Sequence, residues 1–543
     1  MIQTLQTLRM PSLSVFRQTD ISRTLSLTLI CAIIMMIPAL INGRPFHFVD
    51  FNQYFSIGEI ITERVIGSPA ETASPDDSGS LPVMTDDGPA PVSQTIQDQT
   101  DTSPETADDD GYFSTIAGGR SPLYALIAYI ISAKISMWLL CLMQTALASW
   151  LIIRFLDFST GDRRPYLVLG VVAGLTFFTS LGFHANYTMP DIYAGFLSIS
   201  AILLIFKKDM DRLETLGLTA LICASAFMHT TILLLGVVFF VLSVAYLIPA
   251  WSRSHVRLIA PACILGAVIV SFAVQSAYGI AAEKLTGEPL RSPPYLTARV
   301  YDDGPGNLYL QKACAKDSDA YALCAFADVE YDNHNELIWG SGQVDKPSFI
   351  DSPAELKREL LEEQTRFVTD AISAYPLQQI GASLENMVAQ FFDVSIHEIH
   401  EGAVHILHNY LGDSPQALAY TPGFRHCLQS PDSCTEANVF NSAWNGVVYT
   451  SDLTALISFM LILAVWSGYR FSPSAAPDLA EQDRFLFVAW TIFLLLLANA
   501  FVCGAASGVH DRYQARIIWI VPLCLAGMYP QIRQLSDHVL SRR

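Results

Sequence analysis

Charged side chains are scarce in this sequence. Asp, Glu, Lys and Arg together make up 15% of the 543 residues, whereas hydrophobic residues make up 51%. Soluble globular domains carry about 25% charged residues, so the shortage argues against a soluble protein. Basic residues are fewer than acidic ones, 32 against 51, and no stripe of Lys and Arg alternates with aromatic residues. The sequence therefore excludes a nucleic-acid interface.

Familiar catalytic motifs are also missing. The sequence has no Walker motif, no dinucleotide fingerprint, no nucleophilic-serine elbow and no H-E-x-x-H. Its apolar runs contain almost no Asp, Glu, Lys or Arg, whereas coupled pumps and transporters usually bury such residues at mid-membrane. We therefore expect any chemistry to take place at the membrane surface, on its outer face.

Long apolar runs are what the sequence has in abundance. Several approach the ~20 residues that a helix needs to cross a bilayer, which predicts an all-α polytopic membrane protein with about ten transmembrane helices. The first run follows Arg9 and Arg17, has Arg23 near its start and precedes a poor cleavage site, so we expect it to be kept as a signal anchor. The expected spans are residues 21–41, 136–156, 165–183, 190–206, 214–229, 230–250, 257–281, 449–468, 485–503 and 515–532.

Basic residues in the short loops orient these spans. Loops rich in Lys and Arg stay on the cytoplasmic side, and only a cytoplasmic N-terminus places most of them there. These residues are Arg154, Arg163, Arg164, Lys207, Lys208, Arg212, Arg253, Arg257, Arg470, Arg484, Arg533, Arg542 and Arg543. We therefore expect a protein of a bacterial inner (plasma) membrane with both termini cytoplasmic. The expected parts are a cytoplasmic N-terminus (1–20), a transmembrane module (21–282), an extracytoplasmic loop domain (283–448), and a C-terminal transmembrane module with a cytoplasmic tail (449–543).

The first external loop, residues 43–135, contains an acidic insert. Residues 68–110 are rich in Ser, Thr, Pro, Asp and Glu and contain no Lys, Arg or His, so we expect this insert to be disordered. A solvated linker is the plain interpretation, and a metal-binding or regulatory role is the alternative. Residues 121–133 predict an apolar helix lying at the bilayer surface.

The loop domain is expected to contain disulfides. Four of the ten cysteines lie in it, and their closeness in sequence predicts the pairs Cys314–Cys324 and Cys427–Cys434 in an oxidising compartment. Zinc is the alternative, although no C-x-x-C spacing supports it. The sequence of this domain also predicts helices at 353–374 and 376–392.

Two carboxylates stand out near the outer ends of expected spans. Asp50 lies among aromatic residues just after the first span, where it could act as a general base. Asp191 ends the loop before the fourth span. Each has a structural alternative, because an Asp at the start of a helix is an ordinary cap.

The last outer loop carries the most informative pattern. Arg512 and Arg516 are one helical turn apart, so they share a helix face, and Arg binds phosphate oxygens bidentately. Their position on the outer side departs from the usual charge bias. They therefore predict a phosphate clamp with Tyr513 between them and His510 beside it. Pairing with Asp511 or with a lipid head group is the alternative.

Three further residues are weaker pocket candidates. His229 stands between two apolar runs, where a satisfied structural histidine is the alternative to a functional one. Arg299 and Asp303 precede a Gly-Pro-Gly sequence, which lets backbone approach a ligand closely but is equally explained by a turn.

Taken together, these residues resemble the GT-C superfamily of membrane glycosyltransferases, the polyprenyl-phosphate-sugar-dependent group that includes protein mannosyltransferases and lipid A aminoarabinose transferases. Three features carry the resemblance: Asp50 in a long first external loop, the Asn-Tyr-Thr-Met-Pro-Asp sequence from Asn186 to Asp191, and a large external segment before the last spans. It covers residues 20–282 and 449–535. Some subfamilies have paired acidic residues in the first loop, whereas here Phe51 follows Asp50. A divalent metal cofactor is therefore left open.

The resemblance implies an inverting sugar transfer at the outer leaflet. Asp50 would deprotonate the acceptor, Arg512 and Arg516 would hold the phosphate of a polyprenyl-phosphate-linked sugar donor, and Asp191 would orient hydroxyl groups. The acceptor would be a glycan, a lipid or a protein of the cell envelope. Two other readings are a polysaccharide polymerase or ligase, which predicts that Asp50→Ala is tolerated, and a transporter or flippase, which predicts internal repeats. A non-catalytic envelope scaffold would leave the paired arginines without a purpose.

Overall fold

The computed structural model describes residues 13–43, 45–48, 50–62, 119–161, 164–253, 255–286, 289–340, 346–397, 399, 444–471 and 479–541. In these residues every regular element is a helix, and the one extended pairing is an isolated parallel bridge between Phe46 and Tyr187. The predicted all-α class is therefore confirmed for the described part of the chain. The acidic insert at 68–110 and the pair Cys427–Cys434 lie outside it.

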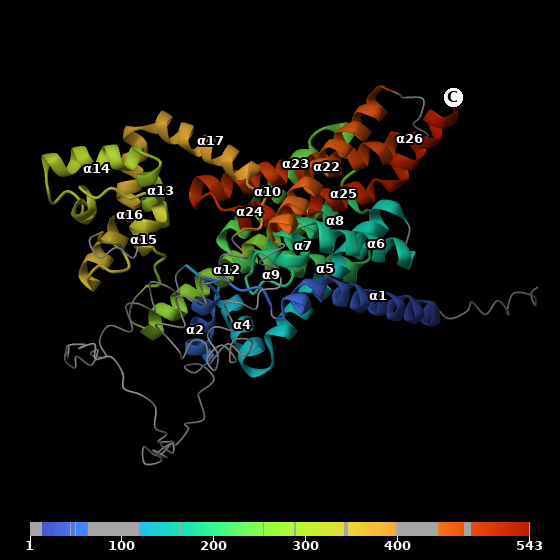
Figure 1. Cartoon of the computed structure of the whole chain (residues 1–543), viewed down its shortest axis with the longest axis horizontal. Helices are drawn as coiled ribbons and strands as arrows, with labels where there is room; N and C mark the ends of the chain where they lie inside the picture. Colours follow the sequence, from blue (N-terminus) through green and yellow to red (C-terminus); the bar gives the residue numbers. More distant parts are fainter. Residues whose placement is uncertain are drawn as a thin grey trace, which may run out of the picture.

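A bundle of long apolar helices forms the body of the protein (Figure 1). Six described helices are long and apolar enough to cross a membrane, or seven if Asp511–Gly527 and Tyr529–Asp537, bent by 41°, make one span. The protein is therefore a polytopic membrane protein. The bundle helices are α1 (Leu13–Asn42), α5 (Met137–Thr160), α6 (Pro165–Phe178), α8 (Ile192–Phe206), α9 (Arg212–Met228), α10 (Thr230–Leu247), α12 (Ala260–Thr286), α22 (Trp444–Phe471), α23 (Leu479–Ala506), α24 (Asp511–Ile518), α25 (Ile520–Gly527) and α26 (Tyr529–Ser541), with the short α7 (Leu181–His184) and α11 (Ala250–Arg253) between them.

Helix α8 is the centre of the bundle. Each of its fifteen residues is buried, and its neighbours include α5, α9, α10, α23 and α24. At ~1.5 Å per residue it is shorter than the hydrocarbon core of a bilayer, which is about 30 Å thick. Because protein surrounds it, its ends need not reach the lipid surface, and a run of fifteen apolar and small residues suffices.

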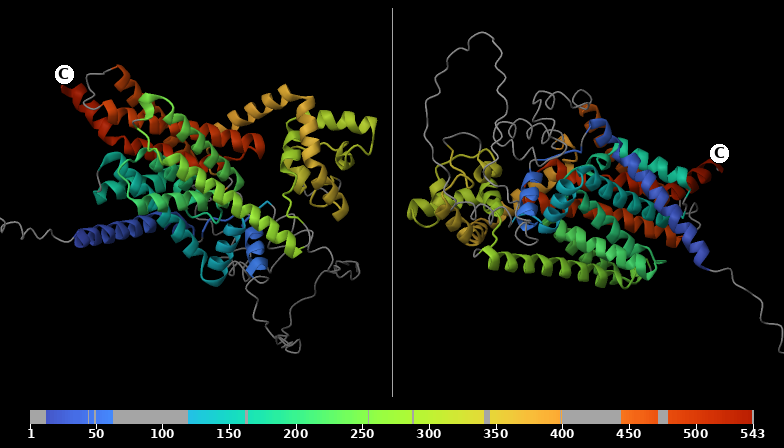
Figure 2. Two further views of the ribbon diagram at one scale, coloured as in Figure 1. Left: turned by 180° about the vertical axis from the view of Figure 1, so that it is seen from behind. Right: turned by 90° about the horizontal axis from the view of Figure 1, so that it is seen from below.

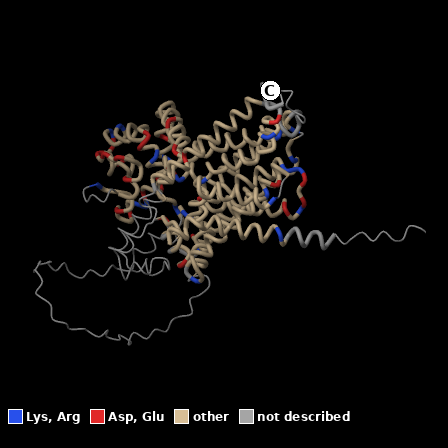
Figure 3. Tube along the Cα trace, turned by 45° about the vertical axis from the view of Figure 1, so that its right-hand side comes forward, with Lys and Arg blue, Asp and Glu red and all other residues tan. Residues whose placement is uncertain are grey.

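Charged residues gather at two ends of the structure. Figure 3 shows most of them in the domain after α12 and at the opposite end of the bundle, with a long uncharged stretch of helix between. At that opposite end, called the far end below, Arg154 and Lys207 surround Glu214: Arg154 Nη2 and Lys207 Nζ lie 2.6 and 2.8 Å from Glu214 Oε1. Two spaced clusters of charge with apolar helix between them fit a bilayer around the middle of the bundle.

Residues 295–374 form a separate small domain with its own core. Its helices are α13 (Tyr295–Asp302), α14 (Pro305–Lys316), the 3₁₀ helix η2 (Ala322–Phe326), α15 (His334–Trp339) and α16 (Ala354–Ala374). Buried aromatic side chains, including Phe326, Phe349 and Phe367, fill the core. The Cys314–Cys324 disulfide joins the end of α14 to η2, so the first of the two expected pairs is present. The expected helix at 353–374 is α16.

Helix α17 (Pro376–Phe392) connects this domain to the bundle. In Figures 1 and 2 the domain stands off from the bundle, and α17 runs from one to the other. Close packing fixes the contact with α23, because a Cβ on Gly504 would lie 2.6 Å from the carbonyl oxygen of Asn386. Gln390 adds two bonds: its Nε2 donates to the His510 carbonyl (2.8 Å), and its Oε1 accepts from the His510 N–H (2.9 Å). The end of the bundle that α17 contacts is called the domain end below.

Helices α2 (Asp50–Thr62) and α4 (Pro122–Lys134) pack against each other at the domain end. Their contact is aromatic: the rings of Tyr54 and Tyr124 are 5.0 Å apart, and those of Phe55 and Tyr129 are also 5.0 Å apart. Ser121 starts α4 by accepting a hydrogen bond from the Tyr124 N–H. The expected helix at 121–133 is therefore present, and one of its faces is buried against α2.

Candidate functional site

The segment after α1 is fastened to the loop before α8. Phe46 exchanges backbone hydrogen bonds with that loop, donating to the Asn186 carbonyl and accepting from the Thr188 N–H, both at 2.9 Å. The Thr188 hydroxyl also lies 2.9 Å from Nδ1 of His47. Because Asp50 follows within four residues, this short bridge brings the first external segment to the start of α8, where Asp191 stands.

Asp191 has the position of a helix cap but does not act as one. It is the N-cap residue of α8, yet its side chain makes no capping hydrogen bond. Its carboxylate is buried instead, with Oδ1 at 3.8 Å from Nη1 of Arg516. The structural alternative offered by the sequence, an ordinary helix start, therefore does not account for this carboxylate.

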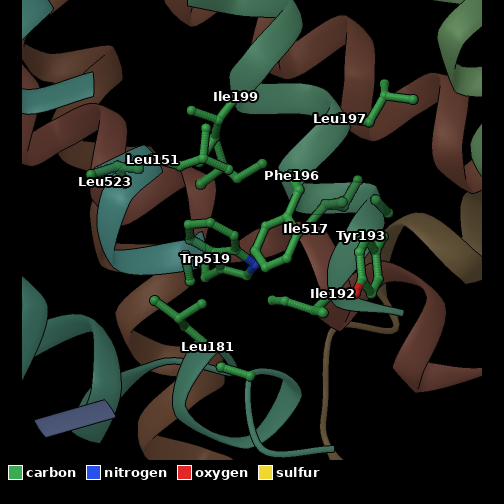
Figure 4. Packing of buried hydrophobic residues seen from close by; sticks show 14 of the residues in the cluster. Leu151, Leu181, Ile192, Tyr193, Phe196, Leu197, Ile199, Ile517, Trp519 and Leu523 are labelled. Atoms are coloured by element: carbon green, nitrogen blue, oxygen red, sulfur yellow. The ribbon is translucent and has the colours of Figure 1, made fainter. Parts of the chain in front are cut away.

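Both arginines of the last loop lie on α24, and the whole of this helix is buried. Trp519, at its C-terminal end, anchors it. Figure 4 shows the indole among Ile192, Phe196 and other apolar side chains of the core. A Cβ on Gly195 would come within 2.6 Å of the Trp519 ring, so the glycine is what lets α24 approach α8. This contact holds Arg516 beside the N-terminus of α8.

Arg516 is held from several sides. Its Nη2 donates to Thr231 Oγ1 (3.1 Å) and to Asn499 Oδ1 (2.9 Å), and it lies 3.2 Å from Cys503 Sγ. Its Nε is buried and has no hydrogen-bond partner among the described residues. The guanidinium is therefore fixed in place without being fully satisfied.

Arg512 lies between a carboxylate and two aromatic rings. Its Nη2 is 3.7 Å from Asp50 Oδ2. Its guanidinium carbon lies 4.1 Å from the centre of the Phe48 ring and 5.2 Å from that of Tyr513, and Arg516 lies at the same 5.2 Å from Tyr513. Tyr513 thus contacts both cations, and a buried aromatic face is a favourable neighbour for a guanidinium.

A third arginine, Arg120, was missed by the sequence reasoning. Its Nη2 lies 2.9 Å from Asp50 Oδ1, and its Nε donates to Gln53 Oε1, also at 2.9 Å. Burial, the largest single influence, would lower the pKa of Arg120, but the Asp50 carboxylate, together with Tyr295 and Tyr54, raises it above its ordinary value. A sequence signal existed: Arg120 is the only basic residue between Arg64 and Lys134, and it directly precedes the apolar helix α4.

These side chains line one small pocket, called the ionic pocket below. It encloses about 20 Å³, roughly the room of one water molecule. Three guanidiniums and two carboxylates face it, so its formal charge is one positive unit. Its lining residues are Asp50, Tyr54, Arg120, Met189, Pro190, Asp191, His229, Ile232, Arg512, Tyr513 and Arg516.

His229 belongs to the same pocket in its neutral form. Nδ1 accepts a hydrogen bond from the Thr231 N–H at 3.2 Å, which leaves the proton of the neutral ring on Nε2. His229 therefore offers the site a neutral donor and no charge.

Two expected pocket residues, Arg299 and Asp303, lie elsewhere. Arg299 and Asp303 line neither this pocket nor the larger cavity described below. They form an ion pair with each other, with Nη2 and Oδ1 2.6 Å apart. Gln379 and Asn386 of α17 donate to the same carboxylate at 2.6 and 2.8 Å. Asp303 therefore joins the domain to α17, and a ligand pocket at this pair stays a prediction.

His510 lies just outside the pocket. Its ring contacts Tyr513, with 5.2 Å between the ring centres, and His334 of the domain at 6.2 Å. The ring of His510 therefore packs against Tyr513, while its backbone carbonyl accepts from Gln390 Nε2 and its backbone N–H donates to Gln390 Oε1.

Among the residues that the structure describes, no group of three or more His, Cys, Asp or Glu is arranged to hold a metal. Comparisons with family models, with curated proteins and with solved structures found no match for this chain. What the site can do therefore has to be argued from its own chemistry.

Proposed function

We propose that this protein is a membrane glycosyltransferase that moves a sugar from a polyprenyl-phosphate donor to an envelope glycan, lipid or protein. The observation that carries the proposal is the meeting of Asp50, Asp191, Arg512 and Arg516, from three distant parts of the chain, in one buried pocket. A buried excess of positive charge is costly unless an anion completes it. A lipid phosphate supplies that anion, and guanidiniums are the side chains best suited to bind it.

The proposed mechanism follows from the neighbours of Asp50. Arg120 holds Oδ1 at 2.9 Å, whereas the contact that the described residues make with Oδ2 is longer, 3.7 Å to Arg512. A phosphate that draws Arg512 toward itself frees Oδ2 to take the proton of the acceptor hydroxyl. The acceptor oxygen then bonds to the anomeric carbon as the bond from that carbon to the phosphate oxygen breaks. The electron pair stays on the phosphate, where Arg512 and Arg516 stabilise the growing negative charge.

We further propose the finer architecture that this function needs: ten spans, a GT-C-like arrangement, and the domain end on the extracytoplasmic side. Each expected span coincides with a helix or, for the last, with the bent series α24–α26, although α6, α8 and α9 are short. The far end carries Arg154 and Lys207 in short loops or helix ends, as cytoplasmic loops do. Reporter fusions at Asp98 and Asp351 test the sidedness, and cytoplasmic activity at either would overturn it.

The function is tested by replacing Asp50, Asp191, Arg512 and Arg516 singly with alanine in cells and comparing envelope glycans by mass spectrometry. We expect a glycan to lose a sugar in each variant, with Asp50→Ala and Arg512→Ala most affected. Arg154→Ala is the matched control, since it removes a partly buried guanidinium from the far end. Normal glycans in normally expressed Asp50→Ala and Arg512→Ala cells would sink the enzyme proposal. Loss with Arg512→Ala but not with Asp50→Ala would favour the polymerase or ligase alternative.

A further inference from the structure

A second and larger cavity adjoins the ionic pocket. It encloses about 190 Å³ between the start of α4, the junction of α9 with α10, and the second half of α12. This space holds several water molecules. We call it the α12 cavity, and its lining residues are Gly119, Arg120, Ser121, Pro122, Phe227, His229, Thr230, Gln275, Tyr278, Gly279 and Leu290.

The lining of the α12 cavity is unusual for a helix that contacts lipid. Gln275, Tyr278 and Gly279 follow a spacing of three and four residues, so they share one face of α12. Ile269 and Ile280, by contrast, are exposed apolar residues on the other side of the same helix. One face of α12 therefore fits the bilayer, and the face that lines the cavity carries an amide, a phenol and a gap left by a glycine.

Two residues belong to both spaces. Arg120 and His229 line the ionic pocket and the α12 cavity, so a ligand in one lies beside a ligand in the other. Since Nδ1 of His229 is occupied by the Thr231 N–H, the Nε2–H remains as the donor of this ring, and none of the described residues accepts it. Intramembrane or interfacial polar groups are functional candidates by default.

We infer that the α12 cavity binds a hydroxyl-rich ring, the sugar of the donor or of the acceptor. The inference rests on the proposed function, and it adds where the sugar lies. No carboxylate lines the cavity, so it does not select a cation. Its neutral amide, phenol, hydroxyl and imidazole groups match the alternating donors and acceptors of sugar hydroxyls. The Tyr278 and Phe227 rings supply the apolar surface that the C–H face of a sugar ring needs. The ionic pocket, which has room for about one water molecule, leaves no space for a ring.

Gly279 allows a clean test. A Cβ at this position would meet no atom within 4 Å, so Gly279→Leu fills the cavity without a backbone clash. Gly266→Leu is the matched control: it adds the same side chain to the same helix, also with no atom within 4 Å of the Cβ, and it does not line the cavity. Gln275→Leu is a second variant, which keeps the volume and removes the amide.

The assay is saturation-transfer NMR of full-length protein in lipid nanodiscs with a panel of methyl glycosides of glucose, galactose, mannose, N-acetylglucosamine and arabinose. We expect at least one methyl glycoside to bind the wild-type and Gly266→Leu proteins. Gly279→Leu should weaken this binding at least tenfold, and Gln275→Leu should weaken it less. Binding by none of the panel, or equal binding by Gly279→Leu and Gly266→Leu proteins of equal thermal stability, would overturn the inference.

A further arm tells the two sources of the ring apart. If the ring belongs to the donor, the corresponding hexose 1-phosphate binds more tightly than the methyl glycoside, because its phosphate reaches the ionic pocket, and Arg512→Ala abolishes the gain. If it belongs to the acceptor, the phosphate adds nothing. Either result supports the cavity as a sugar site. Unchanged glycans in Asp50→Ala cells would reject the proposed function while the binding result stood, so the two failures are distinguishable.

Discussion

A cluster of arginine or lysine and acidic side chains lies at each end of α8, and the two clusters differ in their balance of positive and negative charge. At the far end, Lys207 and Arg154 meet Glu214 at 2.8 and 2.6 Å and also lie 3.7 and 3.8 Å from Asp157. Two cations there face two anions. At the domain end, three guanidiniums face two carboxylates, and two of the three ion pairs are long, 3.7 Å for Arg512–Asp50 and 3.8 Å for Arg516–Asp191.

This difference separates structural charge from functional charge. A partly buried cluster adds stability only when its charges and hydrogen bonds are complete. The far-end cluster meets that condition by itself. The domain-end cluster does not: it has one positive charge in excess, long contacts, and a buried Arg516 Nε without a partner among the described residues. An unbalanced buried cluster persists only if the surrounding helices fix it, and Trp519 and Asn499 do so here.

The largest expected difference between the two ends is in the rate of sugar transfer, which Asp50→Asn at the domain end should lower far more than the same change at the far end. The amide keeps the shape of the side chain but cannot take a proton, so the rate of sugar transfer should fall by about 10²–10⁴-fold, the usual share of general-base catalysis. The measurement is the release of polyprenyl phosphate from donor in membrane vesicles. Asp157→Asn, the same change at the far end, should leave this rate within about twofold. Equal losses in the two variants would mean that Asp50 is only structural.

Trp519→Ala should have the largest effect on stability. The indole is fully buried, its Nε1 donates to the Arg516 carbonyl at 2.9 Å, and it fills the space over Gly195. Large aromatic to alanine changes cost about 3–5 kcal/mol in a packed core, and here α24 would also lose its anchor. The check is the thermal midpoint in nanodiscs, with Trp490→Ala as control, since Trp490 is 55% exposed. Similar midpoints for the two variants would show that α24 is held by other contacts.

Much of the fold was predictable because its signal is local. Apolar runs gave the helical class, and the expected loop-domain helices at 353–374 and 376–392 became Ala354–Ala374 and Pro376–Phe392. Span lengths were less predictable. A window of hydropathy cannot tell a helix that contacts lipid from α8, which is enclosed by protein and needs only fifteen residues.

The site was predictable only in part, because local spacing leaves a pattern in the sequence and contacts between distant segments do not. Arg512 and Arg516 are a helical turn apart, so their common face could be read from their spacing. That Asp50 reaches Arg512 depends on the bridge between Phe46 and Tyr187, a contact across 141 residues that leaves no sequence pattern. Arg299 and Asp303 formed an equally good local pattern, yet their partners are Gln379 and Asn386, which are too far along the sequence to be recognised.

Inorganic phosphate is expected to bind at the domain end of the bundle and not at the far end. The positive excess of the ionic pocket predicts that phosphate stabilises the wild-type protein, by on the order of 1–3 kcal/mol at concentrations of 10 to 100 times its dissociation constant. Arg512→Gln should remove most of the stabilisation, whereas Arg154→Gln should keep it. The measurement is the thermal midpoint against phosphate concentration, with chloride at matched ionic strength. A gain that both variants retain would show that phosphate acts elsewhere.

The smallest expected effect concerns protons at the domain end. His184 is buried beside the ionic pocket, and neither of its ring nitrogens has a hydrogen-bond partner among the described residues. Burial first, and then Arg516 and Arg512, lower the pKa of His184 to about 3, against about 6.5 for a free histidine. Between these values the unfolded chain binds more protons than the folded one. The free energy of unfolding therefore falls as the pH is lowered below about 6.5, and it is level above that pH.

His184→Gln should flatten this acid dependence, because the amide does not titrate. The window from pH 6.5 to 5 is the useful one, since most carboxylates remain ionised there. The thermal midpoint of the wild-type protein should drop across the window and that of His184→Gln should drop less. His397→Gln is the control, because His397 is exposed and should leave the slope unchanged. Parallel slopes for all three proteins would mean that folding does not lower the pKa of His184, because the protonated ring finds a hydrogen-bond acceptor in the folded state. The domain end would then tolerate more positive charge than its three guanidiniums suggest.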